Sequence, residues 1–301
     1  MNTLFAIVGP TAVGKSAVAV ELAQVMNAEI IYVDSVAVYK NFNIGTAKPP
    51  HDEKKGIRHH LIDIVSPSYF FTAGDYCRKA HAAISEITNI EKKVLLVGGT
   101  GLYLRALTQG MFKIPEIPQH IKKELMARLE KEGKLVLYNE LKQHDPVTAE
   151  MIHPHDGYRI LRALEVFYGT GKMLTTYRED HRHCESLKVK KIGLNLPRHE
   201  LHHDIELRTQ KMIQAGLVDE VRTLKEKYDA SCKPFGSVGY KETLQYLHGD
   251  IENVQKLIEK IVIETRSLAR RQLTWFREDK NIKWFDAKKD LGLIRTYLRE
   301  A

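Results

Sequence analysis

The sequence predicts an α/β fold in which a parallel-sheet core is interrupted by an inserted all-helical domain. The first observation behind this prediction is a glycine-rich loop, Gly9–Ser16, between the short apolar run Leu4–Val8 and a helical pattern. The second is a set of further apolar, β-branched runs with helical patterns between them. The third is a stretch, residues 113–190, in which we find helical patterns and no strand-like run.

Four short runs have the composition of buried parallel strands. They are Leu4–Val8, Glu29–Val33, Val94–Val97 and Lys191–Leu196. The first three are followed by segments suited to ligand binding: the loop Gly9–Ser16, Asp34-Ser35, and Gly98-Gly99-Thr100-Gly101. Because ligands of open parallel sheets bind beyond the carboxyl ends of the strands, we expect these segments to line one crevice.

The loop matches the phosphate-binding pattern G-x-x-x-x-G-K-[ST], which makes the predicted core P-loop NTPase-like. Backbone N–H groups of such a loop surround a di- or triphosphate, and the dipole of the following helix, about residues 15–26, strengthens the attraction. Lys15 supplies a point charge, and the Ser16 hydroxyl can hold Mg²⁺. We therefore expect a polyphosphate ligand with Mg²⁺ as the cofactor.

Residues 1–112 and 191–301 are predicted to form the core, and residues 113–190 the inserted helical domain. Two aspartates inside the insertion are candidate N-caps: Asp145, which precedes a proline, and Asp156. Beyond the insertion, two long amphipathic patterns predict a mainly helical C-terminal third. These patterns are Glu200–Lys227 and Ile251–Arg277.

The composition is that of a globular chain with a polyanionic partner. Hydrophobic residues make up 43% and charged residues 28% of 301 residues, which is enough for a substantial core. The formal net charge is +8 and the pI is near 9.2, more than a small phosphate ligand needs, so we expect nucleic acid as a partner. The first apolar run breaks at Gly9-Pro10, and no run resembles a membrane span. We expect a cytoplasmic monomer without membrane contact.

Asp34 decides between reaction types, because it is the only carboxylate at a strand end beside the loop. It can bind Mg²⁺ or cap a turn. Alternatively, it can accept a hydrogen bond from an attacking N–H or O–H group and take its proton as general base. The candidate functions are therefore a group-transfer enzyme with Asp34 as base, a P-loop small-molecule kinase, and a nucleic-acid-binding ATPase.

A zinc-protease pattern also occurs in the chain. His199-Glu200-Leu201-His202-His203 matches H-E-x-x-H. The segment follows Pro197 and lies among charged residues, without the apolar flanks of a buried metal-binding helix. We therefore interpret it as the start of a solvated helix.

Segments spread over nearly the whole chain form a more specific pattern than the phosphate loop alone. They are Gly9–Ser16, Val33-Asp34-Ser35, Ile44-Gly45-Thr46-Ala47-Lys48-Pro49, His59-His60-Leu61-Ile62-Asp63, Gly98-Gly99-Thr100-Gly101-Leu102-Tyr103, His153-Pro154, Arg159, Arg162-Ala163-Leu164-Glu165, Val238-Gly239-Tyr240-Lys241-Glu242, Ala269-Arg270-Arg271-Gln272 and Thr274-Trp275-Phe276. Together they resemble the tRNA dimethylallyltransferases, also called tRNA isopentenyltransferases.

The resemblance implies that the loop binds the diphosphate of dimethylallyl diphosphate, and that the enzyme prenylates N6 of the adenosine immediately 3′ of certain tRNA anticodons. The catalytic residues that it implies are Asp34 as base on N6, Thr11, Lys15 and Arg208. The diphosphate-binding residues would be Gly9, Pro10, Thr11, Ala12, Val13, Gly14, Lys15, Ser16 and Arg208. The tRNA-binding residues would be Asp34, Ser35, Val36, Ala37, Thr100, Lys122, Tyr158, Arg159, Ile160, Leu161 and Arg162.

Two positions depart from the family pattern. Ala37 stands where relatives often have a glutamine, and it has no side-chain hydrogen bond to offer to a base. Gly236 stands where many relatives have a longer polar residue. Both departures concern how tRNA is read, whereas the diphosphate site is unaffected.

Overall fold

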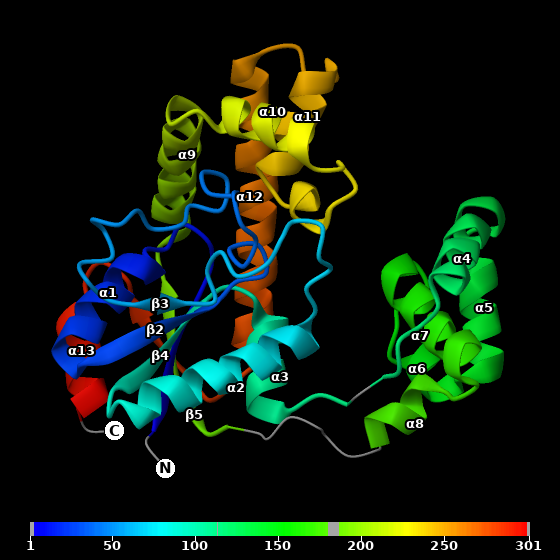
Figure 1. The fold of residues 1–301 in the computed structure, drawn as a ribbon, viewed down its shortest axis with the longest axis horizontal. Coiled ribbons are helices and arrows are strands. Elements are labelled where there is room, and N and C mark those ends of the chain that lie inside the picture. Colours follow the sequence, from blue (N-terminus) through cyan, green and yellow to red (C-terminus); the bar gives the residue numbers. More distant parts are fainter. Residues whose placement is uncertain (1–2, 113, 180–186, 300–301) are drawn as a thin grey trace. The chain divides into compact units, whose positions relative to one another are not determined.

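The computed structural model describes residues 3–112, 114–179 and 187–299. The chain forms two compact units (Figure 1). Unit 1 consists of Met1–Thr108 and Leu187–Ala301, and unit 2 of Gln109–Ser186. The insertion predicted over residues 113–190 overlaps strand β5, which begins at Val189, so the last of those residues belong to the sheet.

Unit 1 contains a six-stranded sheet in the order β3-β2-β4-β1-β5-β6, and all its strand pairs are parallel. The strands are β1 (Leu4–Val8), β2 (Ala28–Val33), β3 (His59–His60), β4 (Lys93–Gly98), β5 (Val189–Asn195) and β6 (Ile282–Asp286). Every residue of β1 and β2 is buried, as expected for strands that are covered on both faces. The predicted α/β fold with a parallel sheet is confirmed. The two edge strands, β3 and β6, were not predicted.

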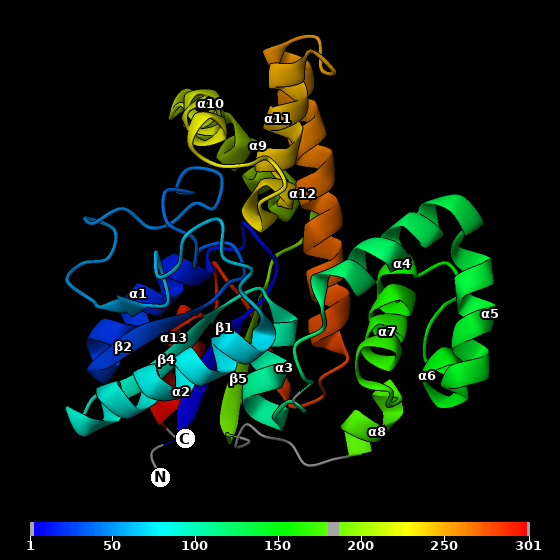
Figure 2. The ribbon, with the colours of Figure 1, turned by 45° about the vertical axis from the view of Figure 1, so that its right-hand side comes forward.

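Helices cover both faces of the sheet. Figures 1 and 2 show α1 (Lys15–Met26) and α13 (Leu291–Arg299) on one face, and α2 (Ala73–Asn89) and α3 (Gly101–Gln109) on the other. Alternate residues of β1, Phe5 and Ile7, share a buried apolar cluster with side chains of α1 and α13. This period of two is what places opposite sides of each strand against different helices.

A helical layer lies beyond the carboxyl ends of the strands. It consists of α9 (Arg198–Gln214), α10 (Leu217–Lys227), the short 3₁₀ helix η1 (Lys233–Gly236), α11 (Tyr240–His248) and α12 (Val254–Arg277). The pattern predicted as one amphipathic stretch over Glu200–Lys227 is two helices, because Gly216 adopts φ 93° between them. Helix α12 packs against α9 and extends past the sheet edge (Figure 2).

The described residues of unit 2 form helices and connecting segments. The helices are α4 (Gln119–Glu132), α5 (Lys134–His144), α6 (Pro146–Glu150), α7 (Gly157–Thr170) and α8 (Leu174–Glu179). Both predicted N-caps are confirmed: Asp145 accepts a hydrogen bond from Thr148 N, and Asp156 accepts one from Arg159 N. The unit has its own apolar core, which includes side chains of α4, α5 and α7.

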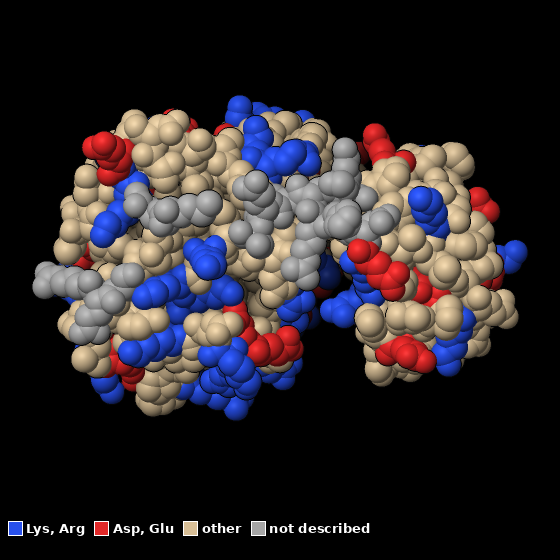
Figure 3. Space-filling view, turned by 90° about the horizontal axis from the view of Figure 1, so that it is seen from below, with Lys and Arg blue, Asp and Glu red and all other residues tan. Residues whose placement is uncertain are grey.

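The surface of unit 1 reflects the positive net charge. On the face seen from below, Lys and Arg side chains gather in a broad area with smaller groups of Asp and Glu (Figure 3). None of the helices in the described ranges is both long enough and apolar enough to cross a lipid bilayer.

Candidate active site

The phosphate loop joins the end of β1 to the first turn of α1. Gly9 has φ 147°, and a Cβ at this position would lie 2.5 Å from the carbonyl oxygen of Leu194 in β5, so only glycine fits. Gly14 adopts φ 89° and precedes the first residue of α1. The loop thus places the free N–H groups of the first helical turn at the carboxyl edge of the sheet, which is the arrangement that binds phosphate.

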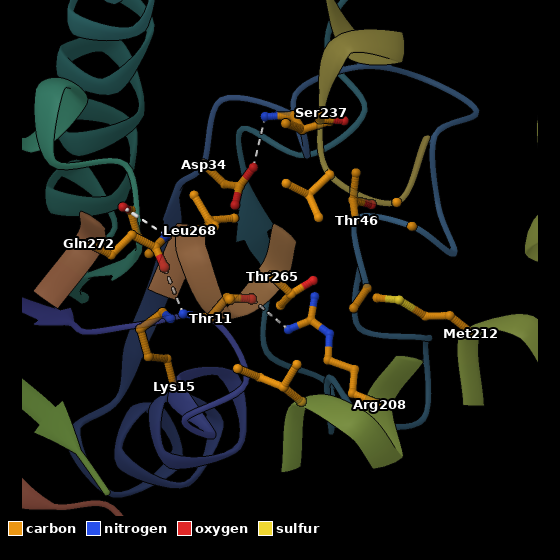
Figure 4. A pocket seen from close by; sticks show the side chains of 18 of the residues that line it. Thr11, Lys15, Asp34, Thr46, Arg208, Met212, Ser237, Thr265, Leu268 and Gln272 are labelled. Carbon is orange, nitrogen blue, oxygen red and sulfur yellow. Dashed lines mark hydrogen bonds between the residues drawn. The ribbon is translucent and has the colours of Figure 1, made fainter. Parts of the chain in front are cut away.

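Two cationic side chains meet at this loop. Lys15 Nζ donates hydrogen bonds to the carbonyl oxygens of Gly9 and Pro10, at 3.1 and 2.6 Å. Arg208 reaches the loop from α9 and donates from Nη1 to Thr11 Oγ1 at 3.1 Å (Figure 4). The predicted diphosphate residues on the loop and on α9, which are almost two hundred positions apart, are therefore brought together.

The positive charge of this pair is not balanced within the described residues, since neither Lys15 nor Arg208 forms an ion pair with a carboxylate there. Burial and the nearby Arg208 lower the pKa of Lys15 to about 7, against the opposing effect of Asp34. Burial likewise lowers the pKa of Arg208, and Asp34 again opposes the shift. A bound polyanion would stabilise the charged forms of both buried side chains, so the electrostatics favour a ligand with several negative charges.

Ser16 is the candidate metal ligand of the loop. Its Oγ lies 2.9 Å from the hydroxyl of Tyr32 in β2. Burial raises the pKa of Tyr32 to about 12, so the phenol stays protonated and neutral. Across the part of the chain that the structure describes, no cluster of three or more His, Cys, Asp or Glu side chains is arranged to hold a metal ion.

The turn after β2 fixes the orientation of Asp34. Its Oδ1 accepts hydrogen bonds from the backbone N–H groups of Val36 and Ala37, at 2.8 and 2.9 Å. The next residue, Ser35, donates its N–H to Thr100 Oγ1 at 3.1 Å. One carboxylate oxygen is thus used to shape the turn, and the turn is joined to the glycine-rich segment that follows β4.

Gln272 joins the phosphate loop to that same segment, and sequence reasoning did not assign it a role. Its side chain reaches from α12, accepts a hydrogen bond from Thr11 N at 2.8 Å, and donates one to Gly99 O at 3.1 Å (Figure 4). A Cβ on Gly99 would lie 2.3 Å from the Gln272 amide nitrogen, so a larger residue at this position would displace the Gln272 side chain. The only signal in the sequence is that Gln272 closes one of the segments that carry the family resemblance.

The three strand-end segments line one cavity of about 160 Å³, which confirms the prediction of a shared crevice. Helices α9 and α12 supply part of its apolar wall. The lining residues include Thr11, Lys15, Ser16, Tyr32, Asp34, Val36, Gly45, Thr46, Ala47, Gly98, Gly99, Ile205, Arg208, Met212, Ser237, Val238, Ile261, Leu268 and Gln272.

Some of the residues predicted to contact tRNA are buried in apolar cores. Ala37 is 2% exposed in the core of unit 1, so only its backbone has a polar role there: its N–H donates to Asp34 Oδ1 and its carbonyl oxygen accepts from Asp63 N. Ile160 is fully buried in the core of unit 2. These two side chains are packed in cores, whereas Tyr158 on the same helix as Ile160 is 79% exposed.

The charged residues predicted on unit 2 lie at its surface. Arg159 and Arg162 belong to α7, where they pair with Asp156 and Glu165 at 3.2 and 3.0 Å. Lys122 lies on α4 and is partly exposed. Elsewhere, the H-E-x-x-H segment opens α9, and its glutamate, Glu200, pairs with Lys288 at the surface.

The shifted pKa of Lys15 makes anion binding depend on pH. Lys15 is largely neutral in the free protein at about pH 8, and a bound anion raises its pKa, so binding takes up a proton there. Affinity should therefore fall as pH rises above about 7. Calorimetry with inorganic diphosphate in two buffers of different ionisation enthalpy measures this uptake. The Lys15→Met variant should lack it, and equal uptake by both proteins would contradict the assignment.

Comparisons with known proteins reveal a consistent set of relatives. The family model described as "IPP transferase" matches residues 37–279. A tRNA dimethylallyltransferase of Geobacter metallireducens is 44% identical over 287 residues, which are 94% of this chain and 92% of that protein. A tRNA dimethylallyltransferase 2 of Syntrophus aciditrophicus is 40% identical over 97% of this chain and 94% of its own length.

Solved structures agree with these sequence relatives. The full-length tRNA isopentenylpyrophosphate transferase of Bacillus halodurans superposes with a TM-score of 0.74 at 35% identity, and the match covers 100% of this chain and 96% of that one. A eukaryotic dimethylallyltransferase acting on tRNA superposes with a TM-score of 0.81 at 28% identity, covering 96% of this chain and 75% of that one.

Proposed function

The chain belongs to the tRNA dimethylallyltransferase family, and from this premise we propose how its cavity performs the transfer. The phosphate loop holds the diphosphate of dimethylallyl diphosphate, and Asp34 accepts the proton from N6 of the adenosine immediately 3′ of the anticodon. The observation that carries this proposal is the pair of cations, Lys15 and Arg208, which lack a carboxylate partner in the described residues and line one cavity with Asp34.

In the reaction, the bond between C1 of the dimethylallyl group and the diphosphate oxygen breaks, and a bond between C1 and N6 forms. Negative charge develops on the departing diphosphate, so groups that bind it more strongly in the transition state speed the reaction. Lys15 and Arg208 supply positive charge, and the loop amides supply hydrogen bonds. Thr11 orients Arg208 through its hydroxyl, at 3.1 Å.

Asp34 is suited to the proton transfer because its carboxylate is held at one oxygen only. Oδ1 is engaged by the Val36 and Ala37 amides, and Oδ2 has no hydrogen-bond donor among the described residues. A base at this oxygen would take the N6 proton as the new bond forms. The target base has to leave its stack to reach a cavity in the protein, and Ser35, Val36 and Thr100 would surround it there.

The site suits a Mg²⁺ ion that takes few of its ligands from the protein and the rest from water and the phosphate oxygens of the substrate. Mg²⁺ commonly keeps several waters and binds through one or two protein oxygens together with phosphate oxygens. Ser16 Oγ at the start of α1 is such an oxygen, and the described residues offer no larger acidic cluster that would compete for the ion. When bound, Mg²⁺ would neutralise charge on the diphosphate.

The exposed residues of unit 2 are proposed to bind the tRNA backbone. Arg159 and Arg162 share one helix with the exposed Tyr158, and Lys122 lies on another helix of this unit. Basic side chains bind phosphates without reading sequence, and an exposed aromatic ring can stack on an unpaired base. These residues would therefore position the anticodon arm rather than take part in chemistry.

Replacing Lys122 or Arg162 by glutamine should weaken tRNA binding with a shallower salt dependence. Each lost phosphate contact lowers the slope of log K against log[salt] by about 0.7–0.9. Filter-binding titrations at several salt concentrations measure this slope. The exposed Lys131 on the same helix as Lys122 provides a matched control in Lys131→Gln. A wild-type slope in either variant would remove that residue from the backbone contacts.

The activity itself is tested by incubating the protein with dimethylallyl diphosphate labelled in the prenyl group, unmodified tRNA and Mg²⁺. We expect label in tRNA and release of diphosphate, without any need for ATP. A parallel reaction with γ-labelled ATP tests the kinase alternative. Label transferred from ATP to a small acceptor, with none from the prenyl donor to tRNA, would contradict the proposal.

A further inference from the structure

The segment from Asn43 to Lys48, here called the wall loop, forms part of the cavity wall. Gly45, Thr46 and Ala47 line the cavity. Ala47 also borders a second hollow, whose other lining residues include Gly14, Lys15, Ser16 and Arg208. The wall loop therefore lies at the end of the cavity where the diphosphate residues gather.

Two side chains from the helical layer hold successive amides of the wall loop. The carboxylate of Glu220 in α10 accepts hydrogen bonds from Asn43 N at 3.1 Å and from Ile44 N at 2.9 and 3.1 Å. The hydroxyl of Tyr240 in α11 accepts one from Gly45 N at 3.1 Å and donates one to Glu220 Oε1 at 2.6 Å. Three consecutive N–H groups are thus bound by one carboxylate and one phenol, which we call the Glu220–Tyr240 clamp.

The clamp is closely packed. Tyr240 is fully buried, its ring lies 4.7 Å from that of Phe42, and a Cβ on Gly45 would lie 2.4 Å from a ring atom of Tyr240. Burial and the adjacent Glu220 carboxylate raise the pKa of the Tyr240 hydroxyl far above its usual range, so the phenol stays protonated and donates a hydrogen bond to Glu220. Loosening the clamp would leave the hydroxyl of the buried Tyr240 and the partly buried amides of Ile44 and Gly45 without these partners.

A separate set of contacts anchors the two ends of the wall loop. Lys48 Nζ donates to Tyr39 O and Asp63 Oδ1, both at 2.6 Å, and Thr46 Oγ1 donates to Phe42 O at 2.7 Å. The fold of the segment therefore does not depend on the clamp alone. The clamp fixes the backbone position of residues 43–45. Through them it determines where Gly45, Thr46 and Ala47 lie along the cavity wall.

We propose that Glu220 and Tyr240 are positioning residues that hold the wall loop against the diphosphate end of the cavity and thereby set the affinity for dimethylallyl diphosphate. The inference rests on the proposed donor site, and it explains why Gly45 and Tyr240 both belong to segments of the family pattern. Neither residue touches the reacting atoms, so binding of the prenyl donor is affected more than the chemical step.

The test compares Tyr240→Phe and Glu220→Gln with two matched controls, Tyr246→Phe on the same helix as Tyr240 and the exposed Glu226→Gln on the same helix as Glu220. Calorimetry gives the Kd for dimethylallyl diphosphate without tRNA. We expect each clamp variant to bind about 10-fold more weakly, because each substitution removes or weakens hydrogen bonds that hold the wall-loop amides. The controls should bind as the wild type does.

Three further measurements separate positioning from a general loss of structure. The Kd for tRNA and kcat at saturating donor should stay close to wild type, while KM for the donor rises. Hydrogen exchange should become faster at the amides of residues 43–45 and remain unchanged in the sheet. The double variant should lose less affinity than the product of the single effects, because both side chains serve one clamp.

Particular outcomes would overturn the inference. The inference is wrong if Tyr240→Phe and Glu220→Gln both fold and bind the donor like the wild type. It is also wrong if the variants bind tRNA more weakly while donor binding is unchanged. If either variant fails to fold, the other is used together with the exchange measurement. A wild-type protein that does not bind dimethylallyl diphosphate would instead contradict the proposed function, so the two failures are distinguishable.

Discussion

Replacing Asp34 by asparagine is expected to slow prenyl transfer by about 10²–10⁴-fold, the usual effect of losing a general base. Asparagine keeps an oxygen that can accept the hydrogen bonds from Val36 and Ala37, so the turn after β2 is retained. The substitution removes the ability to take a proton and also the negative charge of Asp34 in the cavity. Loss of that negative charge should not weaken the binding of an anionic donor or of tRNA, so both should still bind.

Single-turnover experiments with labelled donor and saturating tRNA measure this effect directly, because they exclude product release. Asp52→Asn, an equivalent change at an exposed site, is the control. A rate within a few-fold of wild type would exclude Asp34 as the base. Restoration of the rate by excess Mg²⁺ would point to a metal-binding role instead, which was the alternative that the sequence left open.

The parts of the fold that could be predicted are those set by local patterns. The runs Leu4–Val8 and Glu29–Val33 are apolar because both faces of these strands are covered, and the glycine-rich loop has its characteristic spacing in the sequence. The shared cavity followed from a general rule, since parallel strands place their carboxyl ends at one edge. Each of these predictions needed only neighbouring residues.

The unpredicted strands, β3 and β6, show which elements a local sequence pattern does not reveal. Strand β3 is only two residues long, and only two of the five residues of β6 are buried, so neither has the continuous apolar run of a central strand. The split between α9 and α10 depends on a single residue, Gly216, inside an otherwise regular amphipathic pattern. Such features are decided by pairing and by backbone conformation rather than by composition.

The site residues that sequence reasoning missed act through contacts between distant segments. Gln272 contacts Thr11 across 261 positions of sequence, and Glu220 binds Ile44 across 176. No spacing rule connects residues so far apart. Burial of Ala37 was missed for a related reason: it belongs to a short segment beside Asp34, and only the packed structure shows which side of that segment faces a core.

Replacing Arg208 by alanine is expected to lower kcat/KM for dimethylallyl diphosphate by about 10²–10³-fold, as when one preorganised donor to a developing anion is lost. The guanidinium is hydrogen-bonded to Thr11 and has no carboxylate partner among the described residues, and in the proposed function its charge serves the diphosphate. Arg208→Lys should recover only part of the rate, because an ammonium group cannot make two parallel hydrogen bonds to phosphate oxygens.

The Arg208 variant should also change the titration of Lys15, which separates the loss of a charge beside the phosphate loop from a general loss of structure. Arg208 depresses the pKa of Lys15, so its removal should raise that pKa and reduce the proton uptake on binding inorganic diphosphate at about pH 8. Loss of a like charge from the cavity should leave the melting temperature unchanged or higher. Arg222→Ala, a surface variant on α10, should have no effect on any of these quantities. A destabilised Arg208→Ala protein with normal proton uptake would mean that the guanidinium stabilises the fold. A guanidinium that binds the departing diphosphate lies close enough to Lys15 for its charge to change the pKa of that lysine.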